Sequence, residues 1–157
     1  MKLWEGLGYY NRVRNMQKAA QYMTELYDAR MPADYDKLLA LPGIGPYTAG
    51  AVASIAFEIP VPAVDGNVLR VITRITENDG DILKQSVKHQ VEMELLKIMP
   101  EGKSGAFNQS LMELGATVCV PNGAPKCEAC PVADLCLAHQ NGKEMDYPKR
   151  HRKNRVK

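Results

Sequence analysis

The chain has 157 residues, with 20 Lys and Arg against 18 Asp and Glu and a formal net charge of +2. This length allows one core or two small lobes, and an apolar content of 45% is ordinary for a globular protein. The longest weakly polar run, residues 49–57, is far too short to cross a bilayer, which argues against a membrane-spanning protein. Trp4-Glu5-Gly6 interrupts any apolar N-terminal segment, so we expect no signal peptide and a cytoplasmic location.

The basic residues are concentrated at the C-terminus. Residues 149–157 hold six of the 20 Lys and Arg and no acid, which leaves 14 basic and 18 acidic side chains in residues 1–148. A basic tail is typical both of segments that touch nucleic acid and of solvated linkers. If the rest of the chain binds DNA, it must do so through local backbone donors and a few placed cations rather than a broad positive face.

Apolar residues recur at helical spacings along most of the chain, and no alternating strand pattern occurs. Four stripes are expected to be core faces: Met16, Ala19, Ala20, Met23, Leu26 and Tyr27; Val68, Val71, Ile72 and Ile75; Val87, Val91, Leu95 and Ile98; and Phe107, Leu111, Leu114 and Val118. From Cys119 onward the chain is rich in Pro, Gly and Cys, which predicts loop with single helical turns. The sequence therefore predicts an all-α domain that ends in a cysteine-held loop module.

Residues 41–50, Leu-Pro-Gly-Ile-Gly-Pro-Tyr-Thr-Ala-Gly, are expected to end one helix and start another. A short helix should begin at Ala33 or Asp34 and end at this segment. Pro46 lacks an N–H and suits the first turn of the next helix, which should extend to about Phe57.

Two glycines are expected to shape the connection between these helices. Gly43 and Gly45 allow backbone angles that are barred to other residues. The predicted result is a tight hairpin with free amide N–H groups beside a helix N-terminus, an arrangement that binds phosphate. The alternative is an ordinary loop between two packed helices.

All four cysteines lie within 18 residues, in the pattern Cys119-x7-Cys127-x2-Cys130-x5-Cys136. Cytoplasmic proteins rarely keep disulfides, so clustered cysteines indicate a metal site. Four thiolates without a nearby His fit either structural zinc or an iron–sulfur cluster, and the spacing alone does not decide between them.

The hairpin, with Asp65 fifteen residues after Gly50, resembles the helix-hairpin-helix of the DNA glycosylase superfamily, whose members carry a catalytic Asp after the hairpin. Residues 4–12 (Trp-Glu-Gly-Leu-Gly-Tyr-Tyr-Asn-Arg), 65–68 (Asp-Gly-Asn-Val) and 107–116 (Phe-Asn-Gln-x-x-Met-x-Leu-Gly-Ala) resemble the adenine DNA glycosylase (MutY) family. The resemblance implies the helix-hairpin-helix glycosylase fold, a partial helical barrel with a C-terminal [4Fe–4S] loop.

The resemblance also implies the cofactor. It favours a [4Fe–4S] cluster over zinc, with Cys119, Cys127, Cys130 and Cys136 as ligands. The family spacing is x6, x2, x5, so this chain has one additional residue in its first gap, within the flexible segment 120–126.

The resemblance assigns catalytic roles to three residues. Asp65 would stabilise the positive charge that builds on the sugar, and Asn67 would hold Asp65 and a catalytic water. Tyr47 would hydrogen-bond near the reacting nucleotide. It stands where the bifunctional endonuclease III branch has a Schiff-base Lys, so a monofunctional glycosylase is expected. The simpler alternatives are that Asp65 or Asn67 caps a helix beginning near Asn67 or Val68, and that Tyr47 is a surface residue.

DNA contacts are implied as well. Tyr9 would wedge into the base stack beside the extruded nucleotide, unless it belongs to the core. The hairpin residues expected to contact the DNA backbone are Leu41, Gly43, Ile44, Gly45 and Thr48.

The resemblance therefore implies base-excision repair of double-stranded DNA in the bacterial nucleoid, by removal of adenine mispaired with 8-oxoguanine or G. The alternatives are a non-catalytic helix-hairpin-helix DNA-binding module, a monofunctional thymine or uracil mismatch glycosylase, and a zinc-held interaction domain. The family's general-acid Glu belongs to a segment before the one matched by residues 4–12, so we expect a fragment with weak or no excision activity.

Three regions are expected along the chain. Residues 1–100 would form a helical module with the helix-hairpin-helix at about 34–57 and the Asp65 loop. Residues 101–148 would form the iron–sulfur module. Residues 149–157 would form a basic linker to a C-terminal domain outside this chain.

Overall fold

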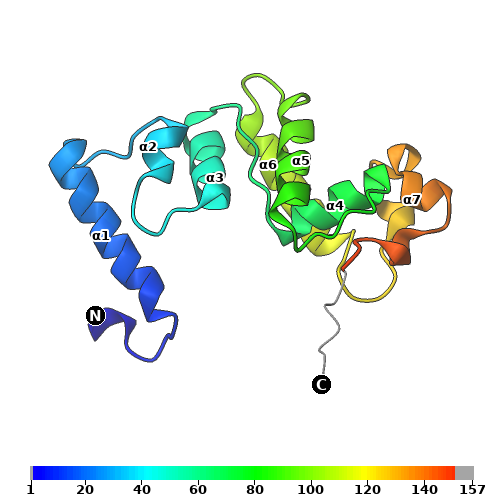
Figure 1. Cartoon of the computed structure of the whole chain (residues 1–157), viewed down its shortest axis with the longest axis horizontal. Coiled ribbons are helices and arrows are strands. Elements are labelled where there is room, and N and C mark those ends of the chain that lie inside the picture. Colours follow the sequence, from blue (N-terminus) through cyan, green and yellow to red (C-terminus); the bar gives the residue numbers. More distant parts are fainter. Residues whose placement is uncertain (1, 151–157) are drawn as a thin grey trace.

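The computed structural model describes residues 2–150, and all regular structure in this range is helical (Figure 1). The α-helices are α1 (Tyr10–Leu26), α2 (Tyr35–Leu39), α3 (Pro46–Phe57), α4 (Gly66–Thr76), α5 (Gln85–Leu96), α6 (Ser104–Thr117) and α7 (Leu137–Gln140). Single 3-10 turns are η1 (Lys2–Trp4), η2 (Cys127–Ala129), η3 (Ala133–Leu135) and η4 (Glu144–Asp146). The predicted all-α class is confirmed. Residues 151–157 of the expected basic linker lie outside the described residues.

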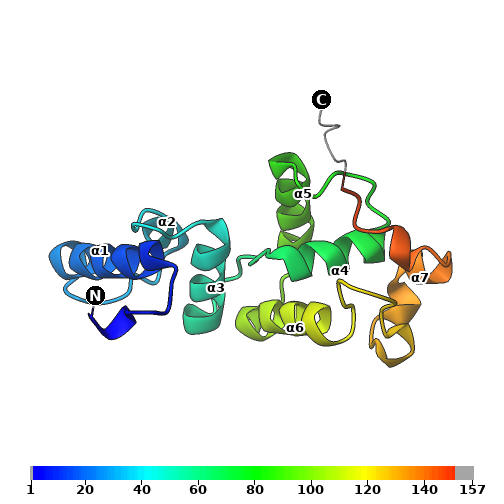
Figure 2. The ribbon, with the colours of Figure 1, turned by 90° about the horizontal axis from the view of Figure 1, so that it is seen from below.

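The helices follow one another along an elongated molecule (Figures 1 and 2). Helices α1 to α3 form one end, α4 to α6 form the middle, and α7 lies at the other end with the turns that follow the cysteines. No helix between residues 2 and 150 combines the length and apolar content needed to cross a membrane.

The two helices of the hairpin form for the reasons that the sequence indicates. The Asp34 side chain accepts a hydrogen bond from the Lys37 N–H at 2.9 Å and so caps α2. Pro46 occupies the first turn of α3, where its missing N–H costs nothing, and α3 ends at Phe57 as predicted. Residues from Cys119 onward form loops with single turns, also as predicted.

Two groups of buried residues form the main core. The first joins α1, α2 and α3 through Ala19, Leu38, Leu41, Ala49 and Ala53. The second joins α4 and α5 through Val64, Val68, Leu69, Val71, Ile72, Val91 and Leu95, and side chains of α6 pack against it. Helix α6 contacts both α3 and α4 and so connects the two groups. The division of the chain near residue 100 stays a prediction.

A buried amide fixes the segment that leads from α3 to Asp65. Asn108 of α6 is 1% exposed, and its Nδ2 donates to Ser54 Oγ at 2.8 Å and to the Val61 carbonyl at 2.9 Å. Its Oδ1 accepts from the Ala63 N–H at 3.3 Å. Because a buried amide left unpaired is costly, these three bonds hold residues 61–63 against α6 and set the approach to Asp65.

Four residues of the predicted core stripes, Met16, Ala20, Leu26 and Ile98, are exposed, which corrects that part of the prediction. Met16 and Leu26 of α1 have exposed fractions of 62% and 64%, because only the side of α1 around Ala19 packs against the first group. Ile98 is 62% exposed because α5 ends at Leu96, before the stripe is complete.

Candidate nucleic-acid interface and metal centre

The hairpin presents unpaired backbone donors at the surface. Gly43 has a left-handed φ of +76°, and a Cβ there would collide with the Asn15 side chain of α1, so this position requires glycine. No described residue accepts a hydrogen bond from the N–H of Gly43 or Gly45. The N–H groups of Tyr47 and Thr48 lie in the first turn of α3, where a helix has no internal acceptors. The hairpin therefore has the donors that an anion site needs.

Gly45 has a different structural environment from Gly43. Its φ of −94° and ψ of 177° are extended backbone that any residue adopts, and a Cβ at this position would meet nothing within 4 Å. The protein itself therefore does not require glycine at position 45. An incoming ligand that approaches the backbone closely would require it.

The Asp65 carboxylate is held by two hydrogen bonds. Its Oδ1 accepts from the Val68 N–H at 2.8 Å, which makes Asp65 the N-cap of α4, and its Oδ2 accepts from Asn67 Nδ2 at 3.0 Å. The helix N-terminus favours a negative charge at this position. The residue is half-buried. Capping and a catalytic role are compatible, because Asn67 fixes the second oxygen without covering the residue completely.

Arg70 extends this arrangement into the protein. Its Nη2 donates to Asn67 Oδ1 at 2.9 Å and to the Gly115 carbonyl at 2.6 Å, and its Nε donates to the Cys119 carbonyl at 2.8 Å. Burial lowers the pKa of Arg70, and the neighbouring charges of Cys119 and Asp65 oppose that shift. The chain of contacts from Asp65 through Asn67 and Arg70 therefore ends at the backbone of the first cysteine.

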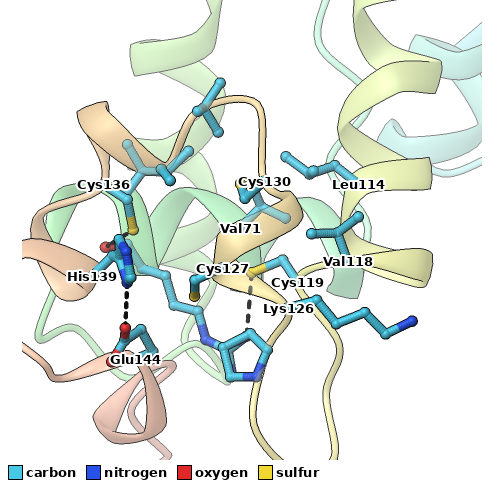
Figure 3. Close-up of a pocket in the computed structure, with 15 residues that line it drawn as sticks. Val71, Leu114, Val118, Cys119, Lys126, Cys127, Cys130, Cys136, His139 and Glu144 are labelled. Carbon is cyan, nitrogen blue, oxygen red and sulfur yellow. Dashed lines mark hydrogen bonds and ion pairs between the residues drawn. The ribbon is translucent and has the colours of Figure 1, made fainter.

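The four cysteines line one cavity, bordered by Val71, Leu114, Val118 and neighbouring residues (Figure 3). Arg74 Nη1 donates to Cys119 Sγ at 3.2 Å and to the Val120 carbonyl at 3.1 Å, and Arg74 Nε donates to the Tyr147 carbonyl at 3.0 Å. A buried guanidinium at this point would compensate the charge of a thiolate that binds a metal. Four sulfur donors around one cavity, with a cation beside one of them, fit a [4Fe–4S] cluster.

The additional residue in the first cysteine gap is accommodated outside the cavity. The Lys126 N–H donates to the Val118 carbonyl at 3.0 Å, which joins the two ends of the loop. Residues 121–124 between them are exposed, and Gly123 adopts a left-handed φ of +76°. The longer gap therefore leaves both Cys119 and Cys127 on the cavity.

Burial, then the negative charges of Glu144 and the other three cysteines, raises the pKa of the Cys127 thiol to about 11. Burial is also the main cause that raises the pKa of Cys136. Without a metal these thiols are protonated at neutral pH, so metal binding must displace their protons.

Tyr47 and Tyr9 lie at different parts of the structure. Tyr47 is on α3, and its hydroxyl lies 3.9 Å from Met112 Sδ of α6. Tyr9 is 78% exposed, has a left-handed φ of 46° as the residue before α1, and lies under the Arg12 guanidinium at 5.3 Å. Tyr9 is therefore not a core residue. Within residues 2–150 no hydrogen bond joins either tyrosine to Asp65, so their roles stay predictions.

Sequence reasoning missed Arg70, Arg74, His139 and Glu144. Arg70 and Arg74 are one helical turn apart on the apolar helix α4, and both are buried, which was the available signal. His139 follows Cys136 by three residues and lines the cysteine cavity, so the expectation that no His lies near the four thiolates is wrong. His139 Nδ1 lies 2.6 Å from Glu144 Oε1, and both residues line the cysteine cavity.

Two family models match the chain: a helix-hairpin-helix motif at residues 26–55, and the iron–sulfur binding domain of endonuclease III at residues 124–136. The second match includes Cys127, Cys130 and Cys136. The [4Fe–4S] cofactor that the cysteine cavity fits is therefore supported by a separate comparison, and the zinc alternative is not favoured.

Curated relatives are adenine DNA glycosylases. That of Mus musculus is 45% identical over 140 residues, which are 88% of this chain and 27% of the relative. That of Schizosaccharomyces pombe is 39% identical, over 89% of this chain and 30% of the relative. That of Buchnera aphidicola subsp. Schizaphis graminum is 34% identical, over 96% of this chain and 43% of the relative. The chain thus spans between about a quarter and two fifths of the length of these relatives.

Solved structures agree with this relationship. A thermostable thymine-DNA glycosylase superposes with a TM-score of 0.71 at 30% identity, over 83% of this chain and 59% of the other. A non-covalent endonuclease III–DNA complex superposes with a TM-score of 0.70 at 34% identity, over 87% and 61%. Hairpin, cysteine loop and sequence similarity along most of its length together place the chain in the adenine DNA glycosylase family of helix-hairpin-helix, iron–sulfur DNA glycosylases.

Proposed function

We propose that this chain carries the sugar-facing and phosphate-binding part of a monofunctional adenine DNA glycosylase. Its substrate would be double-stranded DNA with adenine mispaired with 8-oxoguanine or G, and its reaction would be hydrolysis of the N-glycosidic bond. The observation that carries the proposal is the Asp65 carboxylate, held by Asn67 at the N-terminus of α4 and reached through a loop pinned by Asn108.

The chemistry follows from the charge that develops as the base leaves. The sugar becomes positive, and a fixed carboxylate stabilises this transition state more than the neutral substrate. Asp65 needs no reorganisation, since both of its oxygens already accept hydrogen bonds. The unpaired amides of the hairpin would bind phosphates on the same strand, which brings the extruded nucleotide toward the carboxylate.

Tyr47 supports a monofunctional reaction. A covalent imine with the sugar requires an amine at this position, and a phenol cannot supply one. We expect that borohydride does not trap this chain on DNA, and that strand cleavage requires alkali after the base has been removed.

Adenine is favoured over thymine or uracil because the curated relatives are adenine DNA glycosylases, although one structural neighbour is a thymine-DNA glycosylase. A non-catalytic module would need no carboxylate oriented by a side-chain amide. Duplexes with A opposite 8-oxoguanine, and with T or U opposite G, separate these three possibilities.

The test is single-turnover excision with protein in excess, which also detects slow reactions, followed by hot alkali. Asp65→Asn should lower adenine excision opposite 8-oxoguanine by roughly a hundredfold or more, because the transition-state charge is no longer stabilised. Asn is itself a good N-cap, so DNA binding and thermal stability should change little.

Asp34→Asn is the matched control, because Asp34 caps α2 through the same kind of hydrogen bond but lies on another helix. It should leave excision unchanged. Equal and measurable excision by the Asp65→Asn and Asp34→Asn variants would contradict the catalytic assignment of Asp65, and excision of T or U alone would contradict the adenine assignment.

A further inference from the structure

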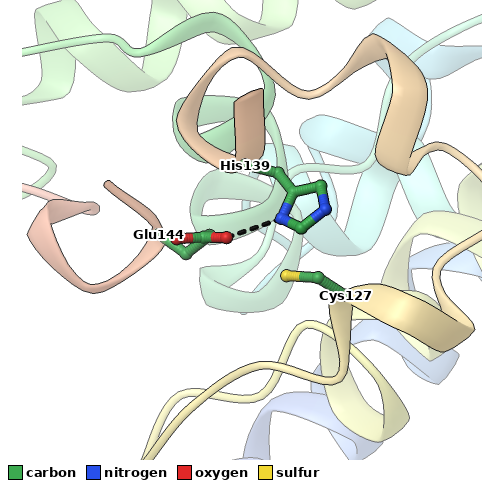
Figure 4. A group of neighbouring side chains, drawn as sticks. All are labelled: Cys127, His139 and Glu144. Carbon is green, nitrogen blue, oxygen red and sulfur yellow. Dashed lines mark hydrogen bonds and ion pairs between the residues drawn. The ribbon is translucent and has the colours of Figure 1, made fainter. Parts of the chain in front are cut away.

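Three side chains outside the glycosylase chemistry converge beside the cysteine cavity. Cys127 comes from η2, His139 from α7 and Glu144 from η4 (Figure 4). One donor atom of each lies within 4.8 Å of the others. His139 Nδ1 and Glu144 Oε1 are 2.6 Å apart, so the imidazole and the carboxylate already face one another. The four-cysteine ligand set gives His139 and Glu144 no role.

The three residues lie at the boundary between the cysteine cavity and the solvent. All of them line the cysteine cavity, and all of them also line an open groove on the outer side of the loop, together with Ala124 and Met145. The His139 and Glu144 side chains are 40% and 21% exposed. A cation held among the three residues would therefore have protein donors on one side and room for a water on the other.

We propose that Cys127, His139 and Glu144 form a mononuclear site for a divalent cation of the Zn²⁺ class. A thiolate, an imidazole and a carboxylate are the three ligand types that zinc takes, at about 2.3, 2.0–2.1 and 2.0–2.2 Å. Donor atoms within 4.8 Å of one another need only a small closure to reach such distances. Binding would replace the His139–Glu144 hydrogen bond with two metal bonds and release the Cys127 thiol proton to solvent.

This site and the iron–sulfur cluster exclude each other, because both require the Cys127 sulfur. Zinc at the outer site would keep one of the four cluster ligands occupied. The site therefore makes cluster assembly sensitive to zinc. The inference concerns metal occupancy and does not depend on the proposed excision of adenine.

The first test uses Co²⁺ as a spectroscopic probe for zinc, on the full chain with Cys130→Ser, which removes both the cluster and a four-cysteine zinc site. We expect one Co²⁺ per chain, with the charge-transfer intensity of a single sulfur ligand. His139→Ala and Glu144→Gln in this background should each weaken Co²⁺ binding at least tenfold. Cys136→Ser provides a second background, in case Cys130→Ser does not fold.

Two variants serve as matched controls, the first at a residue distant from the site and the second at a residue beside it. His89→Ala removes the histidine of another His–Glu pair, and Glu128→Gln removes an exposed carboxylate next to Cys127. Both should bind Co²⁺ like the parent. The proposal is overturned if His139→Ala and Glu144→Gln also bind Co²⁺ like the parent. It is also overturned if the charge-transfer intensity shows two sulfur ligands, because two of the remaining cysteines would then bind the Co²⁺.

The second test uses the chain with all four cysteines. One equivalent of Zn²⁺, added to the cluster-free protein before reconstitution with iron and sulfide, should reduce the cluster absorbance at least twofold. His139→Ala should assemble the cluster with less inhibition by zinc, whereas His89→Ala should behave like the parent. Equal zinc inhibition in both variants would show that the four cysteines alone bind the zinc, and would overturn the proposal.

Discussion

At the scale of single residues, Gly45 is a position where DNA binding, and not the fold, should require glycine. Its backbone is extended and its surroundings are open, so Gly45→Ala should leave the melting temperature unchanged. The new methyl group would stand where a phosphate approaches the hairpin amides. Loss of one charge-assisted hydrogen bond predicts a roughly tenfold weaker affinity for duplex DNA. Unchanged affinity, measured by fluorescence anisotropy at fixed salt, would refute phosphate binding at the hairpin.

Substitution of Arg70 should destabilise the fold strongly. Its guanidinium donates hydrogen bonds to the Asn67 side chain and to the carbonyls of Gly115 and Cys119. The single ammonium group of Lys cannot reproduce this planar arrangement of donors. Leaving buried acceptors unpaired predicts that Arg70→Lys lowers the free energy of unfolding by about 2 kcal/mol. Urea denaturation measures this. The control is Arg14→Lys, which changes only an exposed contact and should be neutral; equal effects would contradict the network.

At the scale of helices, two helical glycines should respond in opposite directions to the same substitution. A Cβ at Gly115 of α6 would lie 2.7 Å from Asn67 Cβ and 3.0 Å from the Asn67 carbonyl oxygen, so Gly115→Ala forces α6 away from α4. We expect a loss of about 1–3 kcal/mol of stability. Gly66→Ala, at the open first position of α4, should be neutral or stabilising by up to about 1 kcal/mol. A stabilising Gly115→Ala in denaturant titrations would contradict the tight α4–α6 contact.

The helices and the hairpin could be predicted from the sequence because their causes are local. Pro46 and Gly43 act within one or two residues of their own position, and the start of α3 follows from them. The exposure of Met16 and Leu26 could not be predicted, because periodicity reports which residues share a face and not whether another element covers that face.

At the scale of the whole molecule, the partners of the candidate site come from distant segments. Asp65 and the four cysteines were predicted from motifs, each of which is continuous or nearly so. Arg70 and Arg74 were missed because their acceptors, Gly115, Cys119 and Tyr147, are 45, 49 and 73 residues away from them. Only the packing of α4 against α6 and the terminal turns brings these groups together.

Stability should therefore be uneven along the molecule, and metal removal should show it. Residues 119–150 contain only single turns, and their buried group comprises Cys136, Ala138 and Tyr147. So small a group offers little hydrophobic stabilisation, and metal bonds must supply much of the rest. Removing the cluster should abolish amide hydrogen-exchange protection in residues 120–146 while α4 keeps its own, because its core with α5 and α6 contains no metal ligand other than the partly buried Cys119. Retained protection in residues 120–146 would mean that Arg74, through its bonds to Val120 and Tyr147, is sufficient to hold these turns.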